Sequence, residues 1–189
     1  MSSNLLGLTN VCGTRFIPGT RSKLYLVPKG ELTAWPQTAA ELGGTDQGDT
    51  KILEEAFAFN AVSGEGFWRE YDILVDTGAV NETLEGEIGG QAIVSRVNFF
   101  IMGVAAKQKE FADVILDYAG CLIAMIQDKS GNYHVIGNLD DPCFIEAIEG
   151  GTGAAPGDRV GYAYTLYANT GQTSMLYDAT LGINTTPNV

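Results

Sequence analysis

Hydrophobic and polar residues alternate along several short segments of this chain, which is the pattern of half-buried β-strands. In residues 67–76, Tyr71, Ile73 and Val75 alternate with Glu70, Asp72 and, less regularly, Asp76. In residues 160–168, Tyr162, Tyr164 and Leu166 alternate with Gly161, Ala163 and Thr165. Neighbouring side chains of a strand point to opposite faces. We therefore expect these apolar residues in the core and the charged ones in water.

Other segments have the composition of strands bounded by turns. Residues 23–27 precede a Pro-Lys-Gly turn, and residues 31–35 are a candidate hairpin partner for them. Residues 92–104 are mostly apolar, which predicts a strand covered on both faces. Residues 121–127 and 133–137 flank an Asp-Lys-Ser-Gly-Asn turn and predict a hairpin. The remaining predicted strands are residues 52–59, 67–76, 83–88, 144–148, 160–168 and 175–181.

One segment, about residues 105–118, has helical periodicity instead. Phe111, Val114, Ile115 and Tyr118 follow the spacing i, i+3, i+4, i+7, and Gly120 is placed to end the helix in a left-handed conformation. One helix among eight to ten strands predicts a mainly β fold, an antiparallel β-sandwich or barrel. We divide the chain into an N-terminal arm (1–22), a β domain (23–168) with a long polar loop (36–50), and a C-terminal strand and tail (169–189).

Charge restricts the partners this fold can bind. The 189 residues include 11 basic and 23 acidic ones, for a net charge of −12, while 45% are hydrophobic. That hydrophobic content excludes a disordered acidic tail, and the acidity argues against binding nucleic acid by charge attraction. The charge is uneven: residues 1–30 carry +4, residues 31–95 carry −11, and the rest carry −5. The basic residues of the first segment can dock on the acidic body of a neighbouring copy; they are Arg15, Arg21, Lys23 and Lys29.

The chain offers little catalytic chemistry. His134 is the single histidine and is expected to be a solvent-facing strand residue; no serine lies in a G-x-S-x-G motif. The three widely spaced cysteines form no metal-binding pattern, so we predict no catalytic residue, cofactor or metal. No secretory signal and no apolar run of membrane-spanning length is visible. An alternative is a carbohydrate- or ligand-binding module that uses Trp35, Trp68 or the tyrosine-rich residues 162–167.

Several strings together resemble one protein family over roughly residues 20–170. They are Asn10-Val-Cys-Gly13, the run from Gly19 to Val27 and Pro28 that ends at Trp35-Pro36, the helix at 107–118, the hairpin at 121–137 with its Asp-Lys-Ser-Gly-Asn turn, and the late strand Gly161-Tyr-Ala-Tyr-Thr-Leu166 after Gly157-Asp158. In this order they are similar to tail tube proteins of tailed bacteriophages, of the kind found in phages of gut and aquatic Bacteroidetes.

The resemblance implies a structural role without catalysis or cofactor. Such subunits form hexameric rings that stack into a tube, and the tube conducts DNA through its lumen without specific binding. It also implies contacts with tape-measure, terminator or sheath proteins, and a place in the virion tail after synthesis in the host bacterial cytoplasm. Residues 1–22, 36–50 and 169–189 would connect one ring to the next. A tail terminator, baseplate or head decoration protein is the alternative within the virion.

Acidic residues on alternating strands are candidates for the lumen wall. Carboxylates there would repel DNA phosphates, whereas a basic lumen would bind DNA and stall it. The candidates are Glu70, Asp72, Asp76, Glu85 and Glu87. The alternative is that each is an ordinary outward-facing residue of a half-buried strand.

Overall fold

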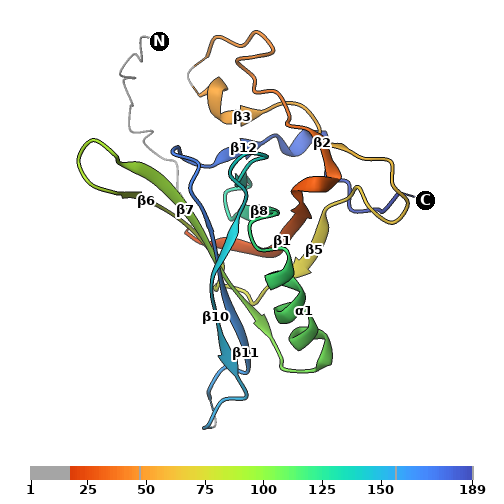
Figure 1. Cartoon of the computed structure of the whole chain (residues 1–189), viewed down its shortest axis with the longest axis vertical. Coiled ribbons are helices and arrows are strands. Elements are labelled where there is room, and N and C mark those ends of the chain that lie inside the picture. The colour runs from red at the N-terminus through yellow and green to blue at the C-terminus, as the bar shows by residue number, and fades with distance from the viewer. Residues whose placement is uncertain (1–17, 47, 156, 189) are drawn as a thin grey trace.

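The computed structural model describes residues 18–46, 48–155 and 157–188 and shows a β-sandwich with one α-helix in these ranges (Figure 1). The strands are β1 (Thr20–Pro28), β2 (Leu32–Ala34), β3 (Ile52–Leu53), β4 (Ala58–Phe59), β5 (Arg69–Asp72), β6 (Ala79–Glu85), β7 (Ala92–Met102), β8 (Leu122–Asp128), β9 (Tyr133–Ile136), β10 (Phe144–Gly151), β11 (Gly161–Ala168) and β12 (Met175–Tyr177). The helix is α1 (Ala106–Asp117), and the short 3-10 turns are η1 (Lys29–Glu31), η2 (Asp49–Lys51) and η3 (Ala179–Leu181).

Two sheets form the sandwich. The larger has six strands in the order β3-β12-β9-β8-β1-β5, and the smaller has four in the order β10-β11-β7-β6. A two-stranded ribbon, β2-β4, forms a third sheet, and its Leu32 packs against the six-stranded sheet. Strand pairs are antiparallel except β3 with β12, and neither sheet closes into a barrel. The predicted class, a mainly antiparallel β fold with one helix, is confirmed, in its sandwich form.

A first core fills the space between the two sheets. Leu24 and Leu26 of β1 meet Phe99 of β7 and Tyr164 of β11, and the rings of Phe99 and Tyr164 stack at 5.1 Å. The helix closes this core: the Phe111 ring lies 4.7 Å from that of Tyr71 and 5.4 Å from that of Tyr164. α1 therefore joins β5 of one sheet to β11 of the other. The alternation expected in residues 160–168 is confirmed.

A second core covers the far face of the six-stranded sheet. Tyr25 and Val27 of β1 point to this side, opposite to their neighbours in the first core. They pack with Trp68, Phe57 and Tyr177, which come from the long segment after β2 and from β12. The six-stranded sheet is thus buried on both faces, which explains the uninterrupted apolar run in β8, whereas the four-stranded sheet has a core on one face.

Two predictions about pairing or burial are wrong, and a third is confirmed only in part. Residues 31–35 do not pair with β1, since β2 pairs with β4 and the neighbours of β1 are β5 and β8. Val75 is 64% exposed, because β5 ends at Asp72 and the chain has already turned. β7 is covered less evenly than predicted: on its outer face Val94 is 2% exposed, whereas Met102 at its end is 60% exposed.

Local predictions agree better with the structure. The helix occupies 106–117 within the predicted 105–118, and Gly120 follows it with a φ of 76°. β8 and β9 form the predicted hairpin. β6 begins before the predicted strand 83–88 and ends at Glu85, so that residues 86–90 form the tip of the β6–β7 hairpin. β1 begins at Thr20, inside the proposed N-terminal arm, and β12 of the proposed tail lies within the six-stranded sheet.

Candidate functional site: the outer face and edges of the four-stranded sheet

The outer face of the four-stranded sheet has polar side chains at its middle, with Val94 and Phe100 of β7 on either side of them. Val97 and Phe99 of β7 point into the first core, so Arg96 and Asn98 point outward. On β11, Thr165 lies opposite Asn98, and its hydroxyl oxygen is 2.9 Å from the Asn98 side-chain oxygen. Polar side chains therefore run across the middle of this face from one strand to the next.

Arg96 is the centre of this face. Its Nε and Nη2 donate to the two carboxylate oxygens of Glu146 on β10, at 2.7 and 2.9 Å, and its Nη1 donates to Glu85 on β6, at 2.5 Å. The guanidinium carbon lies 5.2 Å from the centroid of the Tyr167 ring on β11. One side chain thus connects all four strands. The two carboxylates raise the pKa of Arg96, and the hydrogen bond from Arg96 lowers the pKa of Glu85.

We predict that Arg96→Gln raises the pKa of Glu85 toward that of an ordinary glutamate, measured by NMR titration of its side chain. A depressed pKa contributes stability above the unfolded-state pKa, and this contribution is lost as the pH falls through the folded-state pKa. The variant should therefore melt below wild type at pH 7, with a difference that narrows on acidification. Arg159→Gln removes the same charge from an exposed loop and is the control. Equal Glu85 titrations in both variants would contradict the role of Arg96.

Both edge strands of this sheet are long. β6 has seven residues and pairs with β7, and β10 has eight and pairs with β11; neither has a second neighbour among the described residues. Each edge therefore carries a row of backbone donors and acceptors that can accept another strand. Because the four strands alternate in direction, β6 and β10 run in opposite directions.

The predicted lumen residues lie in three places. Glu85 is on the outer face described above, and Glu87 follows it in the hairpin tip. Glu70 and Asp72 are on β5, at the edge of the other sheet. Asp76 is in a turn, with a φ of 62°, and pairs with Lys129. The structure brings Glu85 together with Arg96 and Glu146, which we did not single out from the sequence.

The predicted arm residues are also separated. Arg15 lies outside the described residues, Arg21 and Lys23 are in β1, and Lys29 is in η1. Lys23 forms ion pairs with Glu70 and, at 2.9 Å, with Asp72 of the same chain. These carboxylates raise the pKa of Lys23. Lys23 is therefore already paired with the acidic body of its own chain.

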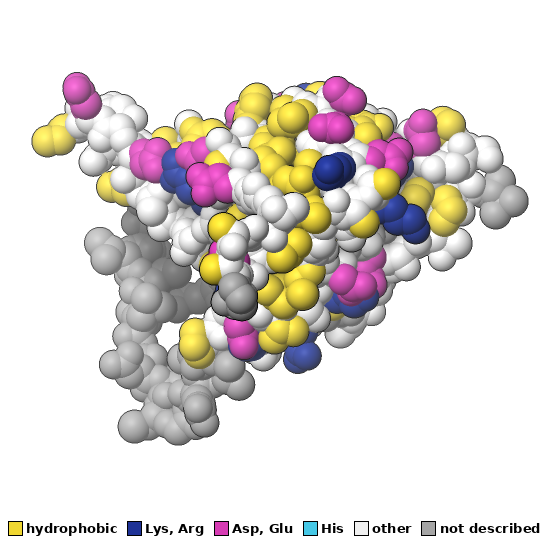
Figure 2. Space-filling view, turned by 90° about the horizontal axis from the view of Figure 1, so that it is seen from below, with side chains coloured by type: hydrophobic (Ala, Val, Ile, Leu, Met, Phe, Trp, Pro, Cys, Tyr) yellow, Lys and Arg dark blue, Asp and Glu magenta, His cyan; other side chains and the backbone are white. Residues whose placement is uncertain are grey.

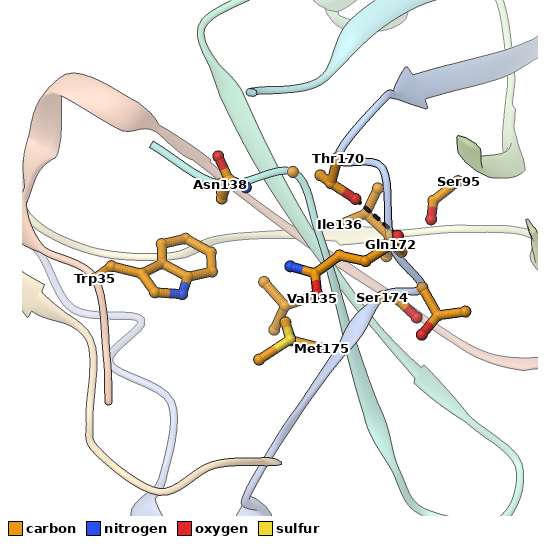
Figure 3. Close-up of a pocket in the computed structure, with 11 residues that line it drawn as sticks. Trp35, Ser95, Val135, Ile136, Asn138, Thr170, Gln172, Ser174 and Met175 are labelled. Atoms are coloured by element: carbon orange, nitrogen blue, oxygen red, sulfur yellow. Dashed lines mark hydrogen bonds between the residues drawn. The ribbon is translucent and has the colours of Figure 1, made fainter. Parts of the chain in front are cut away.

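The aromatic residues of the ligand-binding alternative do not form an open platform. Trp68 is 1% exposed, and Tyr164 is buried in the first core. Trp35 lines a hollow of about 50 Å³ together with residues such as Gln172 and Ser174 (Figure 3). Pockets for organic ligands are several times larger, whereas this one suits ordered water.

Ser174, His134 and Asp128 lie in a row that the sequence did not predict. His134 Nδ1 lies 3.2 Å from Ser174 Oγ, and its Nε2 lies 3.4 Å from the Asp128 carboxylate. No sequence signal connects Ser174 with His134, because they meet only through the pairing of β12 with β9. The Ser174 amide donates to the Glu82 carboxylate at 2.6 Å. A carboxylate at this position opposes the negative charge that acyl transfer would build there, so the row is unsuited to that chemistry.

The described part of the chain contains neither a metal-binding cluster nor a membrane-spanning helix. There, no three histidine, cysteine, aspartate or glutamate residues gather as a metal site would require. No helix in the same ranges has the length and apolarity to cross a membrane. Comparison with protein families, curated proteins and solved structures finds no match to this chain.

Proposed function

We propose that this protein is a self-assembling structural subunit of a virus particle, specifically a tail tube protein of a tailed bacteriophage. The observation that carries the proposal is the four-stranded sheet, which combines polar side chains at the middle of its outer face with two long edges that no other described strand covers. The resemblance of the sequence to tail tube proteins supplies the particular assembly, hexameric rings stacked into a tube. Its partners would be further copies of itself and other tail proteins.

The direction of the edge strands favours a closed ring. Copies related by rotation about an axis along the strands keep the same strand directions. β6 of one copy would then meet β10 of the next in opposite directions, as antiparallel pairing requires. The junction continues the alternation within each subunit, so repeated copies form one uninterrupted sheet. A closed ring also removes the free edges that otherwise invite aggregation.

The charge of the outer face suits a DNA channel. This face carries three carboxylates: Glu85, Glu146 and Glu149, the last of which lies opposite the outward residue Ala163. The positive charge of Arg96 offsets one of the three negative charges. With the polar faces turned inward, a ring would have an acidic lumen that repels phosphates and does not retain DNA. The proposed role is structural and includes no chemical step.

Electron microscopy and light scattering of the concentrated protein test the proposal. Rings, and tubes built from them, are expected for wild type. Rings that never stack would favour a tail terminator, and a monomer at every concentration would contradict the proposal.

A proline in β6 tests the edge itself. Of two neighbouring residues in an edge strand, one amide faces the partner strand and the other faces the free edge. We therefore predict that, of Thr83→Pro and Leu84→Pro, one lowers the melting temperature by breaking the β6–β7 ladder. The other keeps the wild-type melting temperature and abolishes rings, because proline has no amide hydrogen to donate. Rings from the variant of unchanged stability would show that β6 is not the junction.

A further inference from the structure

The β6–β7 hairpin projects away from the body and ends in an exposed hydrophobic residue. Figure 1 shows the hairpin extending to one side of both sheets. Ile88, in the tip at residues 86–90, is 97% exposed, and Leu84 just before the tip is 61% exposed. An isoleucine is a costly residue to leave in water at a glycine-rich turn, where a polar residue serves equally well. Its exposure indicates a surface that another group covers.

A hydrophobic groove lies beside α1. It has a volume of about 150 Å³ and runs between the helix and the end of β1, with Leu26, Tyr71, Phe111, Val114 and Tyr118 among its walls. Val114 is 43% and Tyr118 42% exposed. In the view from below, hydrophobic side chains form a band across the molecule (Figure 2). The one charged residue among those that line the groove, Arg69, is already paired with Glu31.

The hairpin tip and the groove cannot meet within one copy. The tip precedes the first residue of β7, and α1 follows the last, so the two lie at opposite ends of an 11-residue strand. That strand is roughly 36 Å long at about 3.3 Å per residue. Figure 1 accordingly shows the hairpin and α1 on opposite sides of the molecule. A contact between the tip and the groove therefore joins one copy to another. Because this contact uses two different surfaces, each copy can bind a further copy in the same way, and the contact repeats along the assembly.

We propose that the groove beside α1 binds the β6–β7 hairpin tip of a second copy, with Ile88 against its apolar wall. Size supports this occupant, since an apolar hollow of about 150 Å³ can hold a group as large as benzene, and Ile88 is the most exposed large hydrophobic side chain among the described residues, at 97%. The contact displaces copies along β7, whereas pairing of β6 with β10 places them side by side. The first contact therefore stacks rings and the second closes them. This inference rests on the proposed self-assembly and assigns the surfaces that connect successive rings.

Replacing Ile88 separates the two kinds of contact. Ile88→Ser is expected to keep the melting temperature of wild type and to form rings, but to need at least about tenfold more protein to form tubes, because each stacking contact loses a buried side chain. Val62→Ser is the matched control, since Val62 is 51% exposed on another loop. Unchanged tube formation by Ile88→Ser would overturn the inference and leave the proposed function intact. Absence of rings from wild type would instead overturn the proposed function.

Cysteine crosslinking identifies the occupant directly. One tagged copy carries Ile88→Cys and a second, differently tagged copy carries Val114→Cys, both with Cys121→Ser. Oxidation of the mixture is expected to form a disulfide that links the two tagged copies. A control mixture of Val62→Cys with Val114→Cys is not expected to form this link. The native Cys12 stays in place to report on the N-terminal segment. A link from Val114→Cys to Cys12, or no link between the tags under conditions that give tubes, would overturn the proposal.

Discussion

Replacement of Trp68 by alanine is expected to lower the free energy of unfolding by about 3–5 kcal/mol, the range for removing a large aromatic side chain from a core. Trp68 is 1% exposed, and its ring lies edge-on to Phe57 at 5.0 Å. Phe57 in turn contacts the ring of Tyr177 at 5.2 Å. The cavity would lie where the segment after β2 meets β12. The loss of packing would therefore affect the second core, which covers the far face of the six-stranded sheet.

Urea unfolding followed by circular dichroism measures this change. Trp35→Ala is the matched control, because Trp35 is only half-buried at the margin of the same cluster and should cost clearly less. A change below about 1 kcal/mol for Trp68→Ala would contradict a packed second core, since values of that size are typical of surface sites.

Replacement of Arg69 by methionine is expected to lower the free energy of unfolding by about 3 kcal/mol or more. Nη2 of Arg69 donates to Glu31 at 2.7 Å and Nη1 at 3.1 Å, and the Glu31 side chain is 8% exposed. Without Arg69 that carboxylate keeps the Gly66 amide, at 2.8 Å, but loses its counter-charge. Breaking a buried pair by removing one partner leaves an uncompensated buried charge, which costs about 3–5 kcal/mol.

A double-mutant cycle tests the cause of this loss. Glu31→Gln in the Arg69→Met background removes the unpaired charge and should restore part of the stability, which an additive pair would not do. Arg69→Lys should also destabilise, because an ammonium cannot reproduce the two-point contact of the guanidinium. Additive changes across the cycle would show that Arg69 acts through packing alone.

The sequence predicted features that depend on neighbours in the chain. The stripe of α1, the β8–β9 hairpin and the alternation around Tyr164 each follow from a short local pattern, and each is present. The pairing of β2 with β4 depends on which distant strand lies alongside, and the exposure of Val75 depends on where β5 ends. A periodic pattern gives the faces of a strand but contains no information about its partner.

The candidate site shows the same limit. Glu85 was foreseen as a polar strand residue, but its partners Arg96 and Glu146 were not, because they lie on different strands. A signal for Arg96 was present, since it is a charged residue inside the apolar run 92–104. The five predicted lumen carboxylates do not lie together in one chain, because β5 and β6 belong to different sheets.

The two sheets differ in how far apart along the chain their strands lie, and this has a kinetic consequence. The four-stranded sheet consists of two hairpins, β6–β7 and β10–β11, whereas the second core needs β12 to pair with β3 from a distant part of the chain. Local hairpins close quickly, and distant pairings form later. The free edges can thus exist before the fold is complete. We expect crowded, newly made chains to pair through these edges too early, so slow expression at low temperature should increase the yield of ordered particles over aggregates.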